Sequence, residues 1–144
     1  MTIKELSEPD KIDAMNLVWS VFLEFEAPDY EEGGIRTFNN FINDESVIHG
    51  LLMYGAYEQK NLVGVIATRN EGNHISLFFV HSKYHRQGIG RRLFEVAVKN
   101  STSEIITVNS SPYAVAVYHK LGFIDTGAEQ TQDGMRFTPM RYQK

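Results

Sequence analysis

The chain has 144 residues, 42 % of them hydrophobic and 22 % charged, which is typical of one globular domain. Its net charge of −4 argues against a nucleic-acid binder, and its lack of cysteine excludes disulfides, thiolate metal ligands and a cysteine nucleophile. No apolar run resembles a signal peptide or a membrane span, and the five histidines lack metal-binding spacing. We therefore expect one cytoplasmic domain over residues 1–144, with no metal, membrane or nucleic-acid partner.

The first third of the chain predicts a strand and two helices. "TIKEL" alternates as a strand does, and Ser7 and Pro9 open the first helix as cap and first-turn residue. "IRTFNNFIN" predicts the second helix. The apolar residues expected to face the core from the first helix are Ile12, Met15, Trp19 and Phe22.

The middle of the chain predicts a three-stranded meander. "LLMYGAYE", "LVGVIATR" and "HISLFFVH" are strand-like and are separated by short turns. A helix begins near Gly88, and its inward residues are expected to be Ile89, Leu93, Val96 and Ala97.

The last third predicts a strand, a helix and two more strands. "EIITVNS" is the strand, and "SPYAVAVYHKLGF" is the helix, with Ser111 as its N-cap and Gly122 at its end. Two further strands flank Asp133 and Gly134. The inward row of the helix is expected to be Ala114, Val117, Tyr118 and Leu121. This order predicts an α+β fold in which a right-handed crossover makes the middle strand pair parallel.

The segment "RQGIGRR" is the strongest local indication of a ligand. The first turn of a helix presents unpaired N–H groups, and Gly88 and Gly90 leave that backbone bare. Residues 83–99 hold five of the 14 basic residues and one acid, so an anion such as a pyrophosphate fits. The alternatives are an ordinary strand-to-helix turn and a solvated basic face.

Two motifs together resemble those of the Gcn5-related N-acetyltransferase (GNAT) superfamily. "YHRQGIGRRLF" is similar to its motif A and "VNSSPYAVAVYHKLGF" to its motif B, and the order of elements fits over residues 1–144. The resemblance implies a mixed, mostly antiparallel seven-stranded sheet flanked by about four helices, with splayed parallel central strands. It also implies acetyl-CoA as cofactor and direct acetyl transfer to an amine on a small molecule or peptide.

The resemblance also assigns the cofactor contacts. The strand that ends at Val80 would pair with pantetheine, and the turn would hold the pyrophosphate. His85 departs from the family pattern, which has Arg or Gln there. The residues assigned to CoA are Phe78, Phe79, Val80, His85, Arg86, Gln87, Gly88, Ile89, Gly90, Arg91, Arg92, Asn109 and Tyr113.

For catalysis, Tyr118 matches the family tyrosine that protonates the leaving thiolate, although a tyrosine on an inward helix row can simply pack. His74 is the only titratable side chain on its strand, which makes it the candidate base unless it is merely exposed. Glu24 and Glu26 are the other candidates for holding a cationic amine or accepting its proton through water. The acceptor pocket is expected from Glu24, Glu26, Tyr30 and Tyr54, unless the acidic loop is only solvated.

Two further readings remain open at this stage. The same fold could serve as a non-catalytic acyl-CoA-binding or regulatory module. A nucleic-acid or nucleotide binder could instead use the basic N-terminal end of the helix that begins near Gly88. The tail strands and a shared sheet edge also suggest a homodimer.

Overall fold

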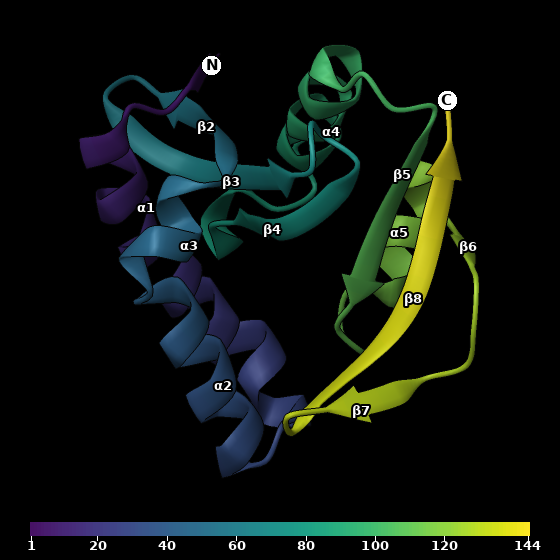
Figure 1. Ribbon diagram of the computed structural model, residues 1–144. Helices are drawn as coiled ribbons and strands as arrows, with labels where there is room; N and C mark the ends of the chain where they lie inside the picture. Colours follow the sequence, from purple (N-terminus) through teal and green to yellow (C-terminus); the bar gives the residue numbers. More distant parts are fainter.

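The computed structural model describes residues 1–144 and is built on an eight-stranded sheet (Figure 1). The strand order is β1-β2-β3-β4-β5-β8-β6, and β7 pairs with β8. The strands are β1 (Thr2–Glu5), β2 (Leu52–Glu58), β3 (Asn61–Arg69), β4 (His74–Val80), β5 (Ile105–Ser110), β6 (Ile124–Asp125), β7 (Gln130–Gln132) and β8 (Met135–Gln143).

Helices cover both faces of this sheet. The α-helices are α1 (Glu8–Val21), α2 (Glu32–Ile42), α3 (Glu45–His49), α4 (Ile89–Asn100) and α5 (Val115–Leu121). Shorter turns are a π-helical turn (Phe22–Glu26) and two 3₁₀ turns (Ala27–Asp29 and Ser82–Tyr84). A core cluster of 16 buried residues joins α1, α2 and α3 to one face, and a cluster of 14 joins α4 and α5 to the other.

The predicted mixed α+β fold and its parallel middle pair, β4 with β5, are confirmed. The structure adds elements too short to produce a periodic pattern. Strand β6 has two residues and helix α3 has five, so the sheet has eight strands rather than seven.

Three local expectations are wrong. Ile12 is 59 % exposed because the buried row of α1 runs through Lys11, Ala14, Met15 and Val18, one position away from it. Val117 is 45 % exposed because it faces a cavity rather than the core. Ser111 accepts from the N–H of Ala114 at 3.3 Å and so caps a turn, and α5 begins only at Val115.

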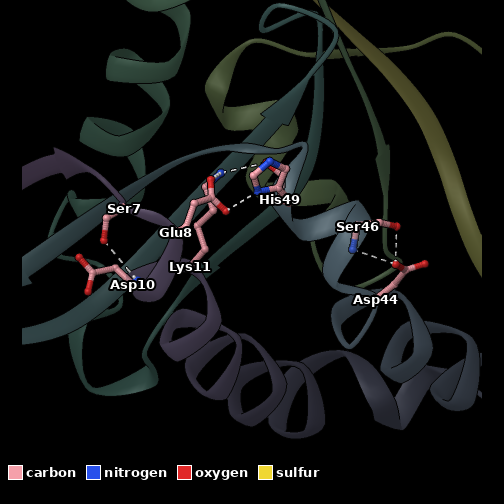
Figure 2. Close-up of polar contacts among 7 residues, drawn as sticks. All are labelled: Ser7, Glu8, Asp10, Lys11, Asp44, Ser46 and His49. Carbon is pink, nitrogen blue, oxygen red and sulfur yellow. Dashed lines mark hydrogen bonds and ion pairs between the residues drawn. The ribbon is translucent and has the colours of Figure 1, made fainter.

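Helices α1 and α3 each have a capped N-terminus, and the start of α1 is joined to the end of α3 (Figure 2). Ser7 accepts from the N–H of Asp10 at 3.4 Å, as its sequence position predicts. The Glu8 carboxylate receives Lys11 Nζ at 2.7 Å and His49 Nδ1 at 2.9 Å, so one side chain of α1 binds the last residue of α3. These contacts hold α1 and α3 together in the helical layer that covers one face of the sheet.

The β7–β8 hairpin crosses to the start of α2 and forms a contact that we call the clasp, made of residues 29–37 and 132–136. Thr37 Oγ1 donates to the carbonyl of Asp133 at 2.7 Å, and Tyr30 Oη donates to the carbonyl of Arg136 at 3.2 Å. Gly34 packs directly on Gly134, where a Cβ on Gly134 would lie 2.7 Å from the nitrogen of Gly34. The clasp therefore connects the two halves of the sheet below the gap between β4 and β5 (Figure 1).

The clasp predicts opposite outcomes for two adjacent glycines. In Gly34→Ala the new methyl group overlaps the carbonyl of Gly134, whereas in Gly33→Ala it meets no atom within 4 Å. We expect Gly34→Ala to lower the free energy of unfolding by about 1–3 kcal/mol. Gly33→Ala should leave it unchanged or raise it by up to about 1 kcal/mol through helix propensity. Urea denaturation measures both, and equal stabilities would show that the two backbones do not touch.

Candidate active site

The site is a gap in the sheet where two parallel strands separate. Only two residue pairs join β4 to β5, His74 with Thr107 and Ile75 with Val108. The register between β3 and β4 shifts at Ser76, and beyond this bulge β4 remains paired only to β3. Main-chain groups of β4 from Ser76 to Val80 therefore border the gap without a partner strand on that side.

Two cavities meet in this gap. The first, the α4 cavity, has a volume of about 680 Å³ and lies at the N-terminal end of α4. The second, the clasp cavity, has a volume of about 290 Å³ and lies above the clasp. The walls of both contain the same five residues, Glu26, Phe78, Phe79, Ala114 and Tyr118. These five mark the junction between the two cavities.

The glycine turn lines the α4 cavity. Gly88 is the N-cap of α4 with φ of 80°, a conformation that favours glycine, and a Cβ there would meet no atom within 4 Å. The N–H of Arg92 donates to Gly88 at 3.1 Å, so the N–H groups of Ile89, Gly90 and Arg91 are the ones left free. This arrangement of bare backbone, free N–H groups and cavity fits a phosphate-bearing ligand.

The structure brings most of the predicted CoA residues to that cavity. Gln87, Arg91 and Arg92 lie outside its wall, and Arg91 Nη2 instead donates to the carbonyl of Lys120 at 3.1 Å. Asn109 lines the clasp cavity. The predicted residues that line the α4 cavity are Phe78, Phe79, Val80, His85, Arg86, Gly88, Ile89, Gly90 and Tyr113.

His85 is hydrogen-bonded to the last residue of β4. Its Nε2 donates to the carbonyl of Val80 at 2.6 Å, and its ring packs against Phe25 with centroids 4.9 Å apart. Phe25 also packs on Tyr113 at 5.1 Å, so it connects the two sides of the gap. Sequence periodicity missed Phe25 because it lies in the π-helical turn, where helical spacing is broken.

Tyr118 lies at the junction of the cavities with its ring in the core. The ring contacts Phe123 at 5.2 Å and Phe78 at 6.0 Å between centroids, and the residue is 5 % exposed. Its hydroxyl makes no hydrogen bond within the chain, and burial raises its pKa well above the usual value. Tyr118 is therefore a protonated phenol with a free hydroxyl between the two cavities.

Glu26 is the second titratable group at the junction. Burial raises the pKa of its carboxyl to about 7, the Ser111 side chain opposes this shift, and the charge of Asp29 adds to it. A carboxyl with a pKa near neutrality exchanges a proton readily at physiological pH.

His74 stands at the closed end of the gap. Its Nδ1 lies 2.7 Å from Thr107 Oγ1, and that hydroxyl also lies 3.4 Å from the carbonyl of Asn73. If the hydroxyl donates to Asn73, Nδ1 carries the proton and Nε2 the lone pair. Burial, together with the nearby charge of Arg69, lowers the pKa of His74 to about 4, so the imidazole is neutral at pH 7.

Two of the predicted acceptor residues lie elsewhere, whereas Glu26 and Tyr30 do line the clasp cavity. Glu24 is exposed and lines neither cavity. Tyr54 is buried in the core cluster beneath α4, on the opposite face of the sheet from the clasp cavity. The error on Tyr54 arose because a strand pattern does not tell which sheet face a residue occupies until the register is known.

Sequence reasoning also missed residues of the clasp cavity. Ser76 interrupts the apolar run "ISLFFV", and its Oγ is the one buried side-chain polar atom without a hydrogen-bond partner. That interruption was the available signal, because a polar residue in a buried strand needs a partner. Others missed on the same wall are Thr37, Phe38, Phe41, Arg69, Arg136 and Phe137.

Comparison with known proteins identifies the fold and the family. The family model described as "Acetyltransferase (GNAT) domain" matches residues 26–144, so the chain belongs to the GNAT acetyltransferase family. The resemblance of the two glycine-containing motifs to that family is thereby confirmed. No helix in the structure is both long enough and apolar enough to cross a membrane.

Solved structures share this fold at low sequence identity. A GCN5-related N-acetyltransferase from Rhodopseudomonas palustris has a TM-score of 0.85 and 20 % identity, covering 99 % of this chain and 95 % of that one. PaiA N-acetyltransferase from Thermoplasma acidophilum, in complex with coenzyme A, has a TM-score of 0.76 and 20 % identity over 100 % of both chains. IAA acetyltransferase from Bacillus cereus has a TM-score of 0.66 and 19 % identity over 99 % of both.

The raised pKa of Glu26 predicts a pH-dependent stability. Its folded pKa of about 7 exceeds the ordinary value of 4.5, so ionisation of Glu26 destabilises the folded state as the pH rises from 4.5 through 7. Glu26→Gln removes this cost, and we expect the variant to gain up to about 3 kcal/mol over the wild type at pH 8 and little at pH 4.5. Urea denaturation across this range measures the difference.

The matched control is Glu24→Gln, which removes an exposed carboxylate outside both cavities. A stability difference between Glu26→Gln and the wild type that does not change with pH would show that Glu26 ionises in the folded protein as it does in water.

Proposed function

We propose that this GNAT protein transfers the acetyl group of acetyl-CoA directly to the amine of an acceptor. The observation that carries the proposal is the junction of the two cavities, where Tyr118 and Glu26 line both. Membership of the family and the coenzyme A complex of the structurally similar PaiA protein support it. The chain has no cysteine, so direct attack by the amine is the simplest route.

The α4 cavity supplies the binding groups for CoA. The free N–H groups of Ile89, Gly90 and Arg91 bind the pyrophosphate, and Arg86 adds positive charge at the cavity wall. The unpaired main chain of β4 from Phe78 to Val80 binds the pantetheine arm, with Asn109 on the opposite strand. Acetyl-CoA, when bound, supplies the thioester that is broken in the reaction.

Tyr118 acts as the proton donor. Its raised pKa keeps the phenol protonated at all physiological pH values, and its hydroxyl is not engaged by another group of the chain. A phenol held in this way donates its proton to the thiolate that leaves when the amide bond forms.

Glu26 takes the proton from the attacking amine. The carboxyl borders both cavities, and with a pKa of about 7 it is about half ionised at neutral pH. His74 is the alternative base, because its neutral imidazole lines the clasp cavity. Both residues are consistent with an acceptor that must lose a proton before or during attack.

Tyr118→Phe tests the proposed reaction. Loss of the hydroxyl should lower the rate of CoA release with an amine by about 10²-fold, chiefly in kcat, because the core packing of the ring is kept. Calorimetry with CoA is the control, and the variant should bind it as the wild type does. Undiminished turnover would remove Tyr118 from the mechanism, and absence of turnover despite CoA binding would favour the non-catalytic module.

The pH profile of kcat/KM distinguishes the two candidate bases. If Glu26 is the base, activity rises with pH through about 7, and Glu26→Gln abolishes this limb. If His74 is the base, the limb lies near 4 and His74→Gln removes it. The ionisation of the amine itself affects all variants equally, so it does not confuse the comparison. A limb near 7 that survives in Glu26→Gln would contradict our assignment.

A further inference from the structure

The two ends of the clasp cavity carry opposite charge. Glu26 and Tyr118 stand at the junction end, and Arg69 and His74 stand at the end where β3 and β4 begin their pairing. The remaining charged groups of the wall, Asp133 and Arg136, both come from the clasp hairpin. A cavity with one free acid at one end and one arginine at the other is suited to a ligand that itself carries both charges.

Arg69 is the arginine of this cavity that lacks a partner. It forms no ion pair and its side chain makes no hydrogen bond, whereas Arg136 binds Glu129 at 3.1 Å and the carbonyl of Asp29 at 3.2 Å. Arg69 lines the wall of the cavity and is also exposed to solvent. An anion entering the cavity would therefore find a free guanidinium.

The distance between the two ends sets the length of such a ligand. Arg69 pairs with His74 across the strands, while the junction residues Phe78 and Phe79 lie four and five residues further along β4. At about 3.3 Å per residue the separation along the backbone is roughly 13–17 Å, and a ligand that meets the end of the Arg69 side chain is shorter than this. A chain of five methylenes between an amine and a carboxylate spans roughly 8 Å when extended.

The wall between the ends contains several aromatic side chains, and the space is small. Phe38, Phe41, Phe79 and Phe137 line it, and the volume of about 290 Å³ is at the lower limit of ordinary ligand sites. Aromatic side chains favour a hydrocarbon spacer, and the unpaired Arg69 disfavours a second cationic group at its end of the cavity.

We propose that the acceptor is a small ω-amino carboxylate, whose amine lies at Glu26 and Tyr118 while its carboxylate binds Arg69. This inference rests on the proposed function, since it names the acceptor of that same reaction. Arg69 acts as a specificity-determining residue.

Three amines of equal length test the charge preference. They are 6-aminohexanoate, hexylamine and 1,6-diaminohexane, compared by kcat/KM for thiol release from acetyl-CoA. We expect kcat/KM for 6-aminohexanoate to exceed that for hexylamine by about tenfold, because its carboxylate gains a charge-assisted contact with Arg69. The diamine should have the lowest kcat/KM, because Arg69 repels its second ammonium group. Among 4-aminobutyrate, 6-aminohexanoate and 10-aminodecanoate, the middle length should be best.

Variants at Arg69 provide the decisive comparison. In Arg69→Gln the ratio of 6-aminohexanoate to hexylamine should fall to about one, and in Arg69→Glu the diamine should become preferred over the acid. Arg36→Gln is the matched control, because Arg36 lies on α2 outside the cavity and should leave the wild-type ratio intact. Thermal unfolding in the presence of CoA measures acceptor binding without turnover. We expect 6-aminohexanoate to raise the Tm of the wild type but not that of Arg69→Gln.

The outcomes separate this inference from the proposed function. Thiol release from hexylamine but not from 6-aminohexanoate, or an acid preference that persists in Arg69→Gln, would overturn the acceptor assignment alone. Absence of release from 6-aminohexanoate overturns the assignment in every case. Absence of release from all the amines, together with no uptake of CoA in calorimetry, would overturn the proposed function as well.

Discussion

The separation of β4 from β5 is the constraint on which the rest of the molecule depends. Two residue pairs hold the strands together, and the bulge at Ser76 then directs β4 away. A complete parallel ladder here would consume the main-chain groups of β4 and fill the space where the two cavities meet. The fold leaves these hydrogen bonds unmade within the sheet, so that they are available to a ligand.

A sheet divided in this way needs support at the open end, and two features supply it. The clasp links α2 to the β7–β8 hairpin through side chain to main chain hydrogen bonds and through the contact of Gly34 with Gly134. Phe25 spans the other side, between His85 and Tyr113. The two core clusters meanwhile secure the helices to opposite faces, and the cluster beneath α4 and α5 contains residues from both halves of the sheet, such as Ile66 of β3 and Ile106 of β5.

The sequence was sufficient for those features that depend on local pattern. The glycine turn at Gly88, the meander and the parallel crossover all follow from periodicity and turn chemistry, and the structure has them. Features that depend on a break in periodicity were not predictable. Phe25 reaches the gap through a π-helical turn, and Ser76 forms the bulge in β4. Glu26 and His74 were named from the sequence, but their places around the gap depend on that turn and that bulge. Tyr54 was misplaced for the same reason, since a side chain's face depends on register.

The π-helical turn at Phe22–Glu26 has a consequence for how chains of this fold can diverge. Such a turn contains one residue more than regular helical winding, and a deletion of one residue within it would restore that winding. The chain after the deletion would keep its orientation, whereas the side chains within the turn would shift by one position relative to α1. A shift of this size would exchange the carboxyl at the meeting point of the cavities for a neighbouring side chain while the sheet stays as it is. A deletion of one residue, without any substitution, can thus change which side chain exchanges a proton at this point in related chains.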